Sequence, residues 1–112
     1  MAVHVLEDDP GVSDSLLTFF VSMGFDVITH KDAESFFAAN PPEPTDTVFV
    51  DLLLPGISGA QVIRWLLGLS KPPRVIAITG QARSAIERQI QGLGHVELLR
   101  KPLNAEAIAA IS

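Results

Sequence analysis

The segment from Thr47 to Gly56 constrains the fold more than any other part of the chain. Its apolar residues, two of them valines, lead directly into the carboxylate of Asp51, and a turn sequence with Pro55 and Gly56 follows. A continuous apolar run bounded by turn residues is typical of a strand buried on both faces of a parallel sheet. In open α/β sheets, functional residues lie at the carboxyl ends of such strands. The pattern therefore places Asp51 where this architecture carries its chemistry.

Composition limits the roles open to this residue. The 112 residues are expected to form one domain, residues 1–112, and no disulfide can support its core because cysteine is absent. No apolar run approaches the length of a membrane span, and the acidic positions 7 to 9 interrupt any signal-peptide pattern. We therefore expect a cytoplasmic protein that does not bind membranes. The formal net charge of −5 argues against direct nucleic-acid binding by this segment, because phosphate contacts need clustered lysine and arginine.

Strand and helix patterns alternate along the chain. Short apolar strands are expected at residues 3–6, 25–29, 47–51, 74–79 and 96–99. Five helices are expected between and after these strands. The first runs from Pro10 to a stop at Gly24, and the second follows a cap at Asp32. The third lies between Gly59 and Gly68, the fourth carries Ile86, Ile90 and Leu93 on one side, and the fifth runs from Asn104 to Ser112. This alternation predicts an α/β fold, with five helices covering both faces of a five-stranded parallel sheet. The proline-rich stretch 40–44 is interpreted as a loop within the domain.

Polar residues follow four of the expected strands at their carboxyl ends. They are Glu7, Asp8 and Asp9 after the first strand, Asp51 at the third, Thr79 at the fourth and Lys101 at the fifth. Crowded carboxylates repel one another unless a cation holds them, and hard oxygen ligands at few positions suit Mg²⁺. A nearby lysine and hydroxyl would stabilise phosphoryl oxygens. The set therefore favours transfer of a phosphoryl group onto a carboxylate.

Each of these residues taken alone has a simpler interpretation. The acidic triplet could be no more than a helix start, Thr79 a turn hydroxyl and Lys101 a solvated charge. Asp51 resists such an account, because a carboxylate that ends a buried strand is costly without a partner. The joint placement on four strand ends favours the functional interpretation, and Asp9 is interpreted as a helix cap.

The histidines and the single tryptophan carry no chemical signal of this kind. His4, His30 and His95 lack the spacing of metal ligands, and surface or packing roles are expected. Trp65 is expected to be a half-exposed helix residue that is able to contact a partner.

The combination Glu7-Asp8, Asp51, Thr79 and Lys101-Pro102 resembles the receiver domain of two-component response regulators, and its spacing fits that family across essentially the whole chain. The resemblance implies a flavodoxin-like, doubly wound sheet with the strand order 2-1-3-4-5. The phrases around positions 3–5, 54–59 and 78–80 are most similar to regulators with a helix-turn-helix output, as in nitrogen-fixation control.

The resemblance also implies roles for individual residues. Asp51 would be the phosphoacceptor, Thr79 would donate a hydrogen bond to the phosphoryl group, and Lys101 would pair with it. The bond between Lys101 and Pro102 would be cis, an isomer that costs little only before proline.

A magnesium site is implied at the same place. Asp8 would bind Mg²⁺ directly and Glu7 through water, while Asp51 and the backbone carbonyl of Leu53 would complete the protein's share of the ligands. Glu7 departs from the family pattern, in which Asp is commoner, and this lengthens one arm of the acidic pair.

The implied function is a switch rather than an enzyme. A sensor histidine kinase would donate the phosphoryl group, and the modified domain would bind a partner or dimerise through the surface of the fourth helix and fifth strand, around Ile86, Ile90 and Val96. We expect it to control a DNA-binding output domain outside this chain. Leu98 stands three residues before the lysine, where the family usually has an aromatic residue that couples the site to this surface.

Three alternatives remain open from the sequence. A chain that ends at Ser112 would be a stand-alone regulator acting as an adaptor. A Mg²⁺-dependent small-molecule phosphatase would use the same acids, but it usually has an Asp two residues after the nucleophile, where this chain has Leu53. A receiver that binds partners without phosphorylation is disfavoured, because Asp8, Asp51 and Lys101 are all present.

Overall fold

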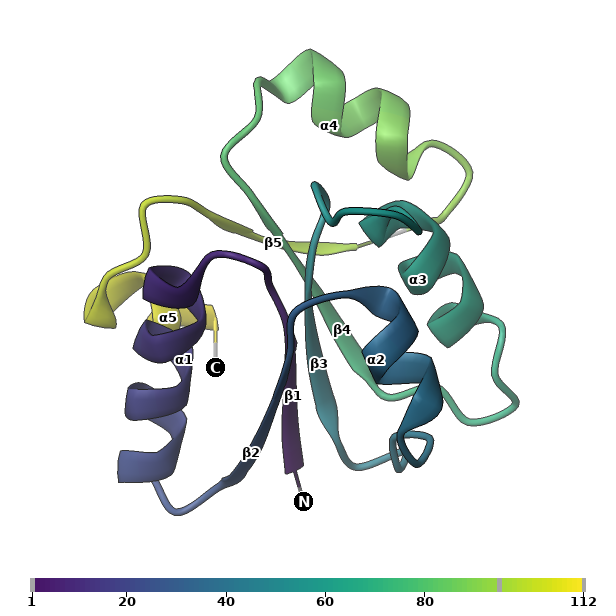
Figure 1. Cartoon of the computed structure of the whole chain (residues 1–112). Coiled ribbons are helices and arrows are strands. Elements are labelled where there is room, and N and C mark those ends of the chain that lie inside the picture. Colours follow the sequence, from purple (N-terminus) through teal and green to yellow (C-terminus); the bar gives the residue numbers. More distant parts are fainter. Residues whose placement is uncertain (1, 95, 112) are drawn as a thin grey trace.

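The computed structural model describes residues 2–94 and 96–111, in which strands and helices alternate (Figure 1). The strands are β1 (Ala2–Leu6), β2 (Asp26–His30), β3 (Thr47–Asp51), β4 (Arg74–Thr79) and β5 (Glu97–Arg100). The helices are α1 (Pro10–Ser22), α2 (Ala33–Ala38), α3 (Gly59–Leu67), α4 (Arg83–Ile90) and α5 (Ala105–Ile111). Two expectations, the packing or surface role of His95 and the end of the last helix at Ser112, lie outside the described residues.

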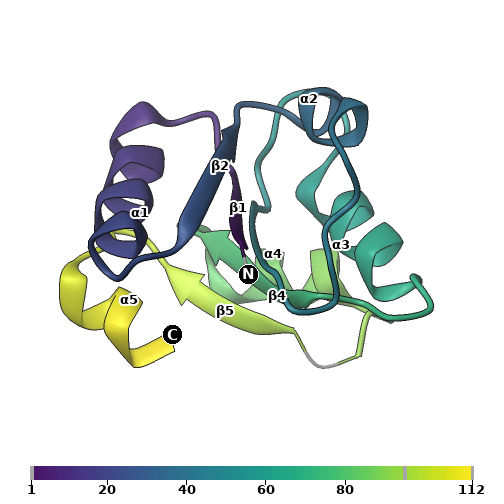
Figure 2. The same cartoon turned by 90° about the horizontal axis from the view of Figure 1, so that it is seen from below.

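The five described strands form one parallel sheet in the order β2-β1-β3-β4-β5, which confirms the predicted fold class. Helices α1 and α5 cover one face, while α2 and α3 cover the other (Figure 2). Side chains of β3 alternate between these layers: Val48 and Val50 pack in the cluster with α2, α3 and α4, and Phe49 packs in the cluster with α1 and α5. Both faces of β3 are therefore buried, as its apolar sequence predicts.

Short polar side chains fix where most of the helices begin. Asp9 accepts a hydrogen bond from the N–H of Gly11 at 2.9 Å, and Asp32 accepts one from Ser35 at 2.8 Å. Helix α3 begins with a reciprocal capping box between Ser58 and Gln61. Helix α5 is capped by Asn104, whose side chain accepts from the N–H of Ala107 at 2.8 Å. Helix α4 differs, because Ala82 precedes it and provides no side-chain cap.

Most predicted boundaries are confirmed, with local corrections. Strands β2 and β5 each begin and end one residue later than predicted. Leu93 was predicted to lie in the fourth helix, but α4 ends at Ile90, because a turn with Gly92 at φ +81° and Gly94 at φ +77° leaves the helical conformation. The peptide bond between Lys101 and Pro102 is cis, as expected.

The loop before β3 is held against the sheet by a buried carboxylate. The side chain of Asp46 accepts hydrogen bonds from the N–H groups of Ala2 and Glu43, both at 2.8 Å, and it also contacts Nε2 of His4 at 3.2 Å. His4 stacks on His30 with 6.2 Å between ring centroids, and both are buried. These two histidines thus have packing roles, one of the two roles predicted for the histidines.

Of two apolar residues predicted to be exposed on helices, one is exposed and the other is not. Trp65 is half-exposed as predicted and packs against Phe37, with 5.1 Å between ring centroids. Ile86 was expected on the outer surface of α4, but it points into the core, because the apolar side of this short helix faces the sheet. Among the described residues, no helix is both long and apolar enough to cross a membrane.

Candidate functional site

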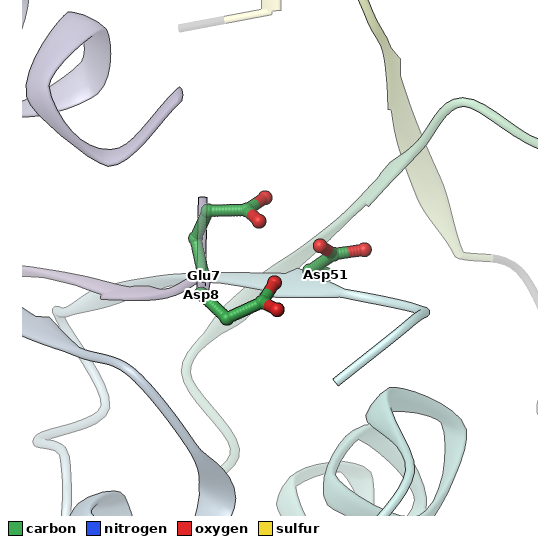
Figure 3. A group of neighbouring side chains, drawn as sticks. All are labelled: Glu7, Asp8 and Asp51. Carbon is green, nitrogen blue, oxygen red and sulfur yellow. The ribbon is translucent and has the colours of Figure 1, made fainter. Parts of the chain in front are cut away.

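The carboxyl ends of four neighbouring strands bring the predicted polar residues to one edge of the sheet. Glu7 and Asp8 follow β1, Asp51 ends β3, Thr79 ends β4 and Lys101 follows β5. Figure 3 shows the carboxyl groups of the three acids directed to the same side. One oxygen from each acid lies within 4.8 Å of the others. The structure therefore brings together the acids that the sequence predicted as a metal site.

Two hydrogen bonds fix the orientation of the Asp51 side chain at the end of β3. Its side chain is buried, and Oδ1 accepts a hydrogen bond from the N–H of Leu53 at 2.9 Å. Its Oδ2 accepts one from Nζ of Lys101 at 3.1 Å. Behind it, the start of α3 presses on the strand end: a Cβ at Gly59 would lie 2.0 Å from the carbonyl oxygen of Asp51. Glycine at position 59 is what allows this close approach.

Glu7 is the most strongly perturbed acid of the site. Burial raises the pKa of its carboxyl group to about 8, and the neighbouring Asp51 carboxyl adds to the effect. Oε1 accepts a hydrogen bond from the N–H of Asp9 at 3.1 Å. Oε2 lies 3.2 Å from Nζ of Lys101, an ion-pair distance, but it is buried without a well-directed hydrogen bond. Glu7 is therefore a buried acid with an oxygen that lacks a proper partner.

Lys101 is the cation of the site. Burial lowers the pKa of its ammonium group, but the contacts with Asp51 and Glu7 outweigh this and raise the pKa above its ordinary value. The lysine is thus charged throughout the physiological range. One ammonium group lies near three carboxyl groups, so its single positive charge cannot neutralise all three when they are ionised.

These residues fit a hydrated divalent cation. Two of the acids, Glu7 and Asp51, are buried, while Asp8 is exposed to solvent and leaves room for bound water. A cation here would remove the repulsion that favours protonation of Glu7 and would give its Oε2 a partner. The donors are all carboxylate oxygens, the kind that Mg²⁺ prefers.

Thr79 connects the site to the neighbouring loop. Its side chain is buried, and Oγ1 accepts a hydrogen bond from the N–H of Gln81 at 3.0 Å. Because Oγ1 is the acceptor in this bond, its own proton is available to another oxygen. The carbonyl oxygen of Thr79 accepts from the N–H of Lys101 at 2.8 Å. The hydroxyl and the lysine are thus coupled through the main chain.

Sequence reasoning missed several contacts at this edge. The main-chain N–H of Asp9 donates to Glu7, and that of Leu53 donates to Asp51. The order of side chains in the sequence does not predict hydrogen bonds from the main chain. Arg100 donates to the carbonyl oxygen of Gln81 at 3.1 Å. Nothing in the sequence indicated that contact, because Gln81 and Arg100 come together only when β4 and β5 pair. Glu34 accepts from the N–H of Ile57 at 3.4 Å, a weaker contact from α2 to the loop after β3.

Comparison with known proteins agrees with the geometry. The sequence profile of the response regulator receiver domain matches residues 3–111. The transcriptional regulatory protein FixJ of Azorhizobium caulinodans is 32% identical over 98% of this chain and 52% of its own length. Nodulation protein W of Bradyrhizobium diazoefficiens is 29% identical over 95% of this chain and 47% of its own length.

A solved structure gives the same result in three dimensions. Full-length FixJ from B. japonicum superposes with a TM-score of 0.81 at 27% identity, covering 98% of this chain and 54% of that protein. The chain spans about half the length of the curated relatives it matches. With the fold, the acidic cluster and the profile in agreement, the chain belongs to the response regulator receiver domain family.

Proposed function

We propose that Asp51 accepts a phosphoryl group in a Mg²⁺-dependent reaction and that the resulting acyl phosphate switches the domain. An oxygen of Asp51 attacks phosphorus, the bond from phosphorus to a histidine nitrogen of the donor breaks, and the histidine is released. The observation that carries this proposal is the buried Asp51 carboxylate, which contacts Lys101 at 3.1 Å beside two further acids. Positioning and charge neutralisation of this kind are the main contributions a protein makes to phosphoryl transfer.

The remaining site residues take complementary roles. Glu7, Asp8, Asp51 and the carbonyl oxygen of Leu53 would hold the Mg²⁺ ion, which neutralises charge on the phosphoryl oxygens. Lys101 pairs with the phosphoryl group, since its ammonium already lies at the acceptor. The Thr79 proton, available because its oxygen accepts from Gln81, completes the set of donors.

The domain acts as a switch in a two-component system. A sensor histidine kinase in the cytoplasm is the donor, and phosphorylation changes partner binding or dimerisation through α4 and β5. The output is a DNA-binding domain outside this chain. Family membership supports the kinase as donor, and the relatives FixJ and nodulation protein W extend over about twice the matched length, FixJ being a transcriptional regulatory protein by name.

Turnover as a small-molecule phosphatase is not favoured by this site. Leu53 stands where a phosphatase of the type considered would carry its acid/base carboxylate, and its side chain is apolar and exposed. The acyl phosphate is therefore an end state that persists long enough to be sensed. The chain acts as a phosphoacceptor and not as an enzyme for a separate substrate.

Phosphorylation with acetyl phosphate tests the proposal directly. Intact-mass spectrometry of wild type with Mg²⁺ is expected to show one phosphoryl adduct, which Asp51→Asn and a chelator both abolish. Asp14→Asn is the matched control, because Asp14 is an exposed acid on α1. An adduct that persists in Asp51→Asn would refute the assignment of the acceptor.

A further inference from the structure

Arg100 ties the loop after Thr79 to the neighbouring strand. Its Nη2 donates to the carbonyl oxygen of Gln81 at 3.1 Å, and the N–H of Gln81 donates to Oγ1 of Thr79 at 3.0 Å. The sheet register pairs Thr79 with Arg100 across β4 and β5. The main chain of Gln81 therefore links the hydroxyl of the site to the guanidinium of the adjacent strand.

We propose that Arg100 is a positioning residue that restrains the loop of residues 80–82 in its unphosphorylated position and so opposes phosphorylation of Asp51. This inference rests on the proposed function, because it concerns the rearrangement that a phosphoryl group at Asp51 requires. It assigns to this arginine a regulatory contact distinct from the metal ligands and from the lysine.

The site cannot accept a phosphoryl group without movement. Nζ of Lys101 lies at hydrogen-bond distance from Oδ2 of Asp51, which leaves no room for a phosphoryl group between these atoms. The main-chain N–H of Lys101 donates to the carbonyl of Thr79, which holds the two strand ends of the site together. When the Thr79 hydroxyl moves to a phosphoryl oxygen, the N–H of Gln81 must follow it or lose its bond. If the N–H follows the hydroxyl, the Gln81 carbonyl is drawn away from Arg100, and the bond between Arg100 and Gln81 opposes this movement.

The surroundings of Arg100 provide a place for the released guanidinium. A groove of about 370 Å³ lies beside it, lined by Arg100, Arg83, Ile86, Glu87, Ile90 and Leu98. Glu87 pairs with Arg83 at 3.3 Å, but both side chains are largely exposed and such a pair contributes little. The groove therefore leaves space beside Arg100 for its side chain when the loop moves.

The charge of Arg100 and its restraint on the loop have opposite effects on anion binding. Removing a positive charge near the site weakens binding of an anionic phosphoryl mimic, whereas removing the restraint strengthens it. Arg83→Ala is the matched control, because Arg83 lines the same groove and carries the same charge but pairs with Glu87 and not with the loop. Tighter binding on loss of Arg100 therefore reports the restraint and not the charge.

The first experiment measures beryllofluoride binding in the presence of Mg²⁺. We expect Arg100→Ala to bind about three- to tenfold more tightly than Arg83→Ala, the factor that corresponds to one hydrogen bond. Arg100→Lys keeps the charge and one donor group, and its affinity should return toward that of wild type. Equal or weaker binding in Arg100→Ala than in Arg83→Ala overturns the proposal.

The second experiment does not depend on phosphorylation. Amide hydrogen exchange at residues 80–82 of the free protein should be faster in Arg100→Ala than in Arg83→Ala, because the loop has lost its tie to β5. Unchanged exchange overturns the restraint. If wild type itself fails to bind beryllofluoride, the proposed function of Asp51 fails, and the exchange measurement still decides whether Arg100 restrains the loop.

Discussion

The ammonium nitrogen of Lys101 lies 3.1 Å from Oδ2 of Asp51, and only 3% of the Asp51 side chain is exposed. The proposed acceptor is therefore already paired with the cation that would hold its product. Before phosphorylation this contact offsets the cost of burying a carboxylate. After phosphorylation the same ammonium would pair with the phosphoryl group. One lysine would thus serve both states of the proposed switch.

Leu53 should slow loss of the phosphoryl group. Its side chain is 58% exposed at the acceptor end of the sheet and cannot orient the water that hydrolyses an acyl phosphate. We expect Leu53→Asn to dephosphorylate several-fold faster than wild type, measured as decay of the phosphorylated mass. Leu53→Met keeps an apolar group and should decay at the wild-type rate. Equal or slower decay in Leu53→Asn would contradict the role given to this side chain.

Leu98 should limit how strongly the site is coupled to the α4–β5 surface. It is 37% exposed beside the groove next to α4, so it is not ordinary core filling. We expect Leu98→Phe to enlarge the dimerisation shift caused by beryllofluoride by about 1 kcal/mol, because a ring buries several tens of Å² more apolar area when it turns inward.

A control separates this coupling from added apolar surface. Val21→Phe places a ring at an exposed position on α1, on the other face of the sheet, and should leave the beryllofluoride-dependent shift unchanged. Sedimentation or light scattering with and without beryllofluoride reports the shift. If Leu98→Phe gives the wild-type shift, the coupling runs through other residues.

Asp46 should make stability depend on pH. Burial alone would raise the pKa of Asp46, but hydrogen bonds from the N–H groups of Ala2 and Glu43 and from His4 lower it below its ordinary 3.8. Because the folded-state pKa is the lower one, the stabilisation is present above pH 3.8 and is lost as pH falls through the folded-state pKa.

Substitution of Asp46 tests this sign. Asp46→Asn should lower the free energy of unfolding by about 1–3 kcal/mol near pH 7, since buried N–H groups lose a charged acceptor. The difference from wild type should shrink in acid, as measured by urea unfolding across pH. Asp26→Asn, at an exposed position of β2, should show no such trend. A difference that stays constant with pH would contradict the assignment.

Gly59 should be intolerant of any side chain. A Cβ there would lie 2.0 Å from the carbonyl oxygen of Asp51, so either α3 or the strand end must shift. We expect Gly59→Ala to cost about 3 kcal/mol of stability and to reduce phosphorylation of Asp51. Gly68→Ala is the control, because its Cβ would meet nothing closer than 3.4 Å. Comparable stability of the two variants in urea would contradict this account.

The sequence predicted the sheet and the gathering of polar residues because both depend on strand periodicity. An apolar run that ends at Asp51 identifies a buried strand, and parallel strands bring Thr79 and Lys101 to the same edge. It could not predict the role of Asp46, which lies in a proline-rich loop whose distant partners Ala2 and His4 become neighbours only after folding.

Helix ends were the other source of error. The stripe of Ile86, Ile90 and Leu93 has helical spacing, but the glycines at 92 and 94 adopt positive φ and end the regular structure first. Leu93 still packs against the core from the turn, so burial preserved the pattern although the helix did not continue. The spacing of apolar residues thus predicts which side chains face the core, but it does not predict whether the backbone there is a helix or a turn.

Helix α4 begins without a side-chain cap and is followed by a turn with two glycines in the left-handed region, whereas α3 begins with a capping box. The segment that would meet a partner is therefore joined to the domain by few specific side-chain bonds of its own. The exposed Arg83 and Glu87 of this helix pair with each other and not with Glu7, Asp51 or Lys101. Under the proposed function, a substitution at these positions would change partner choice while leaving the phosphoryl-accepting residues in place.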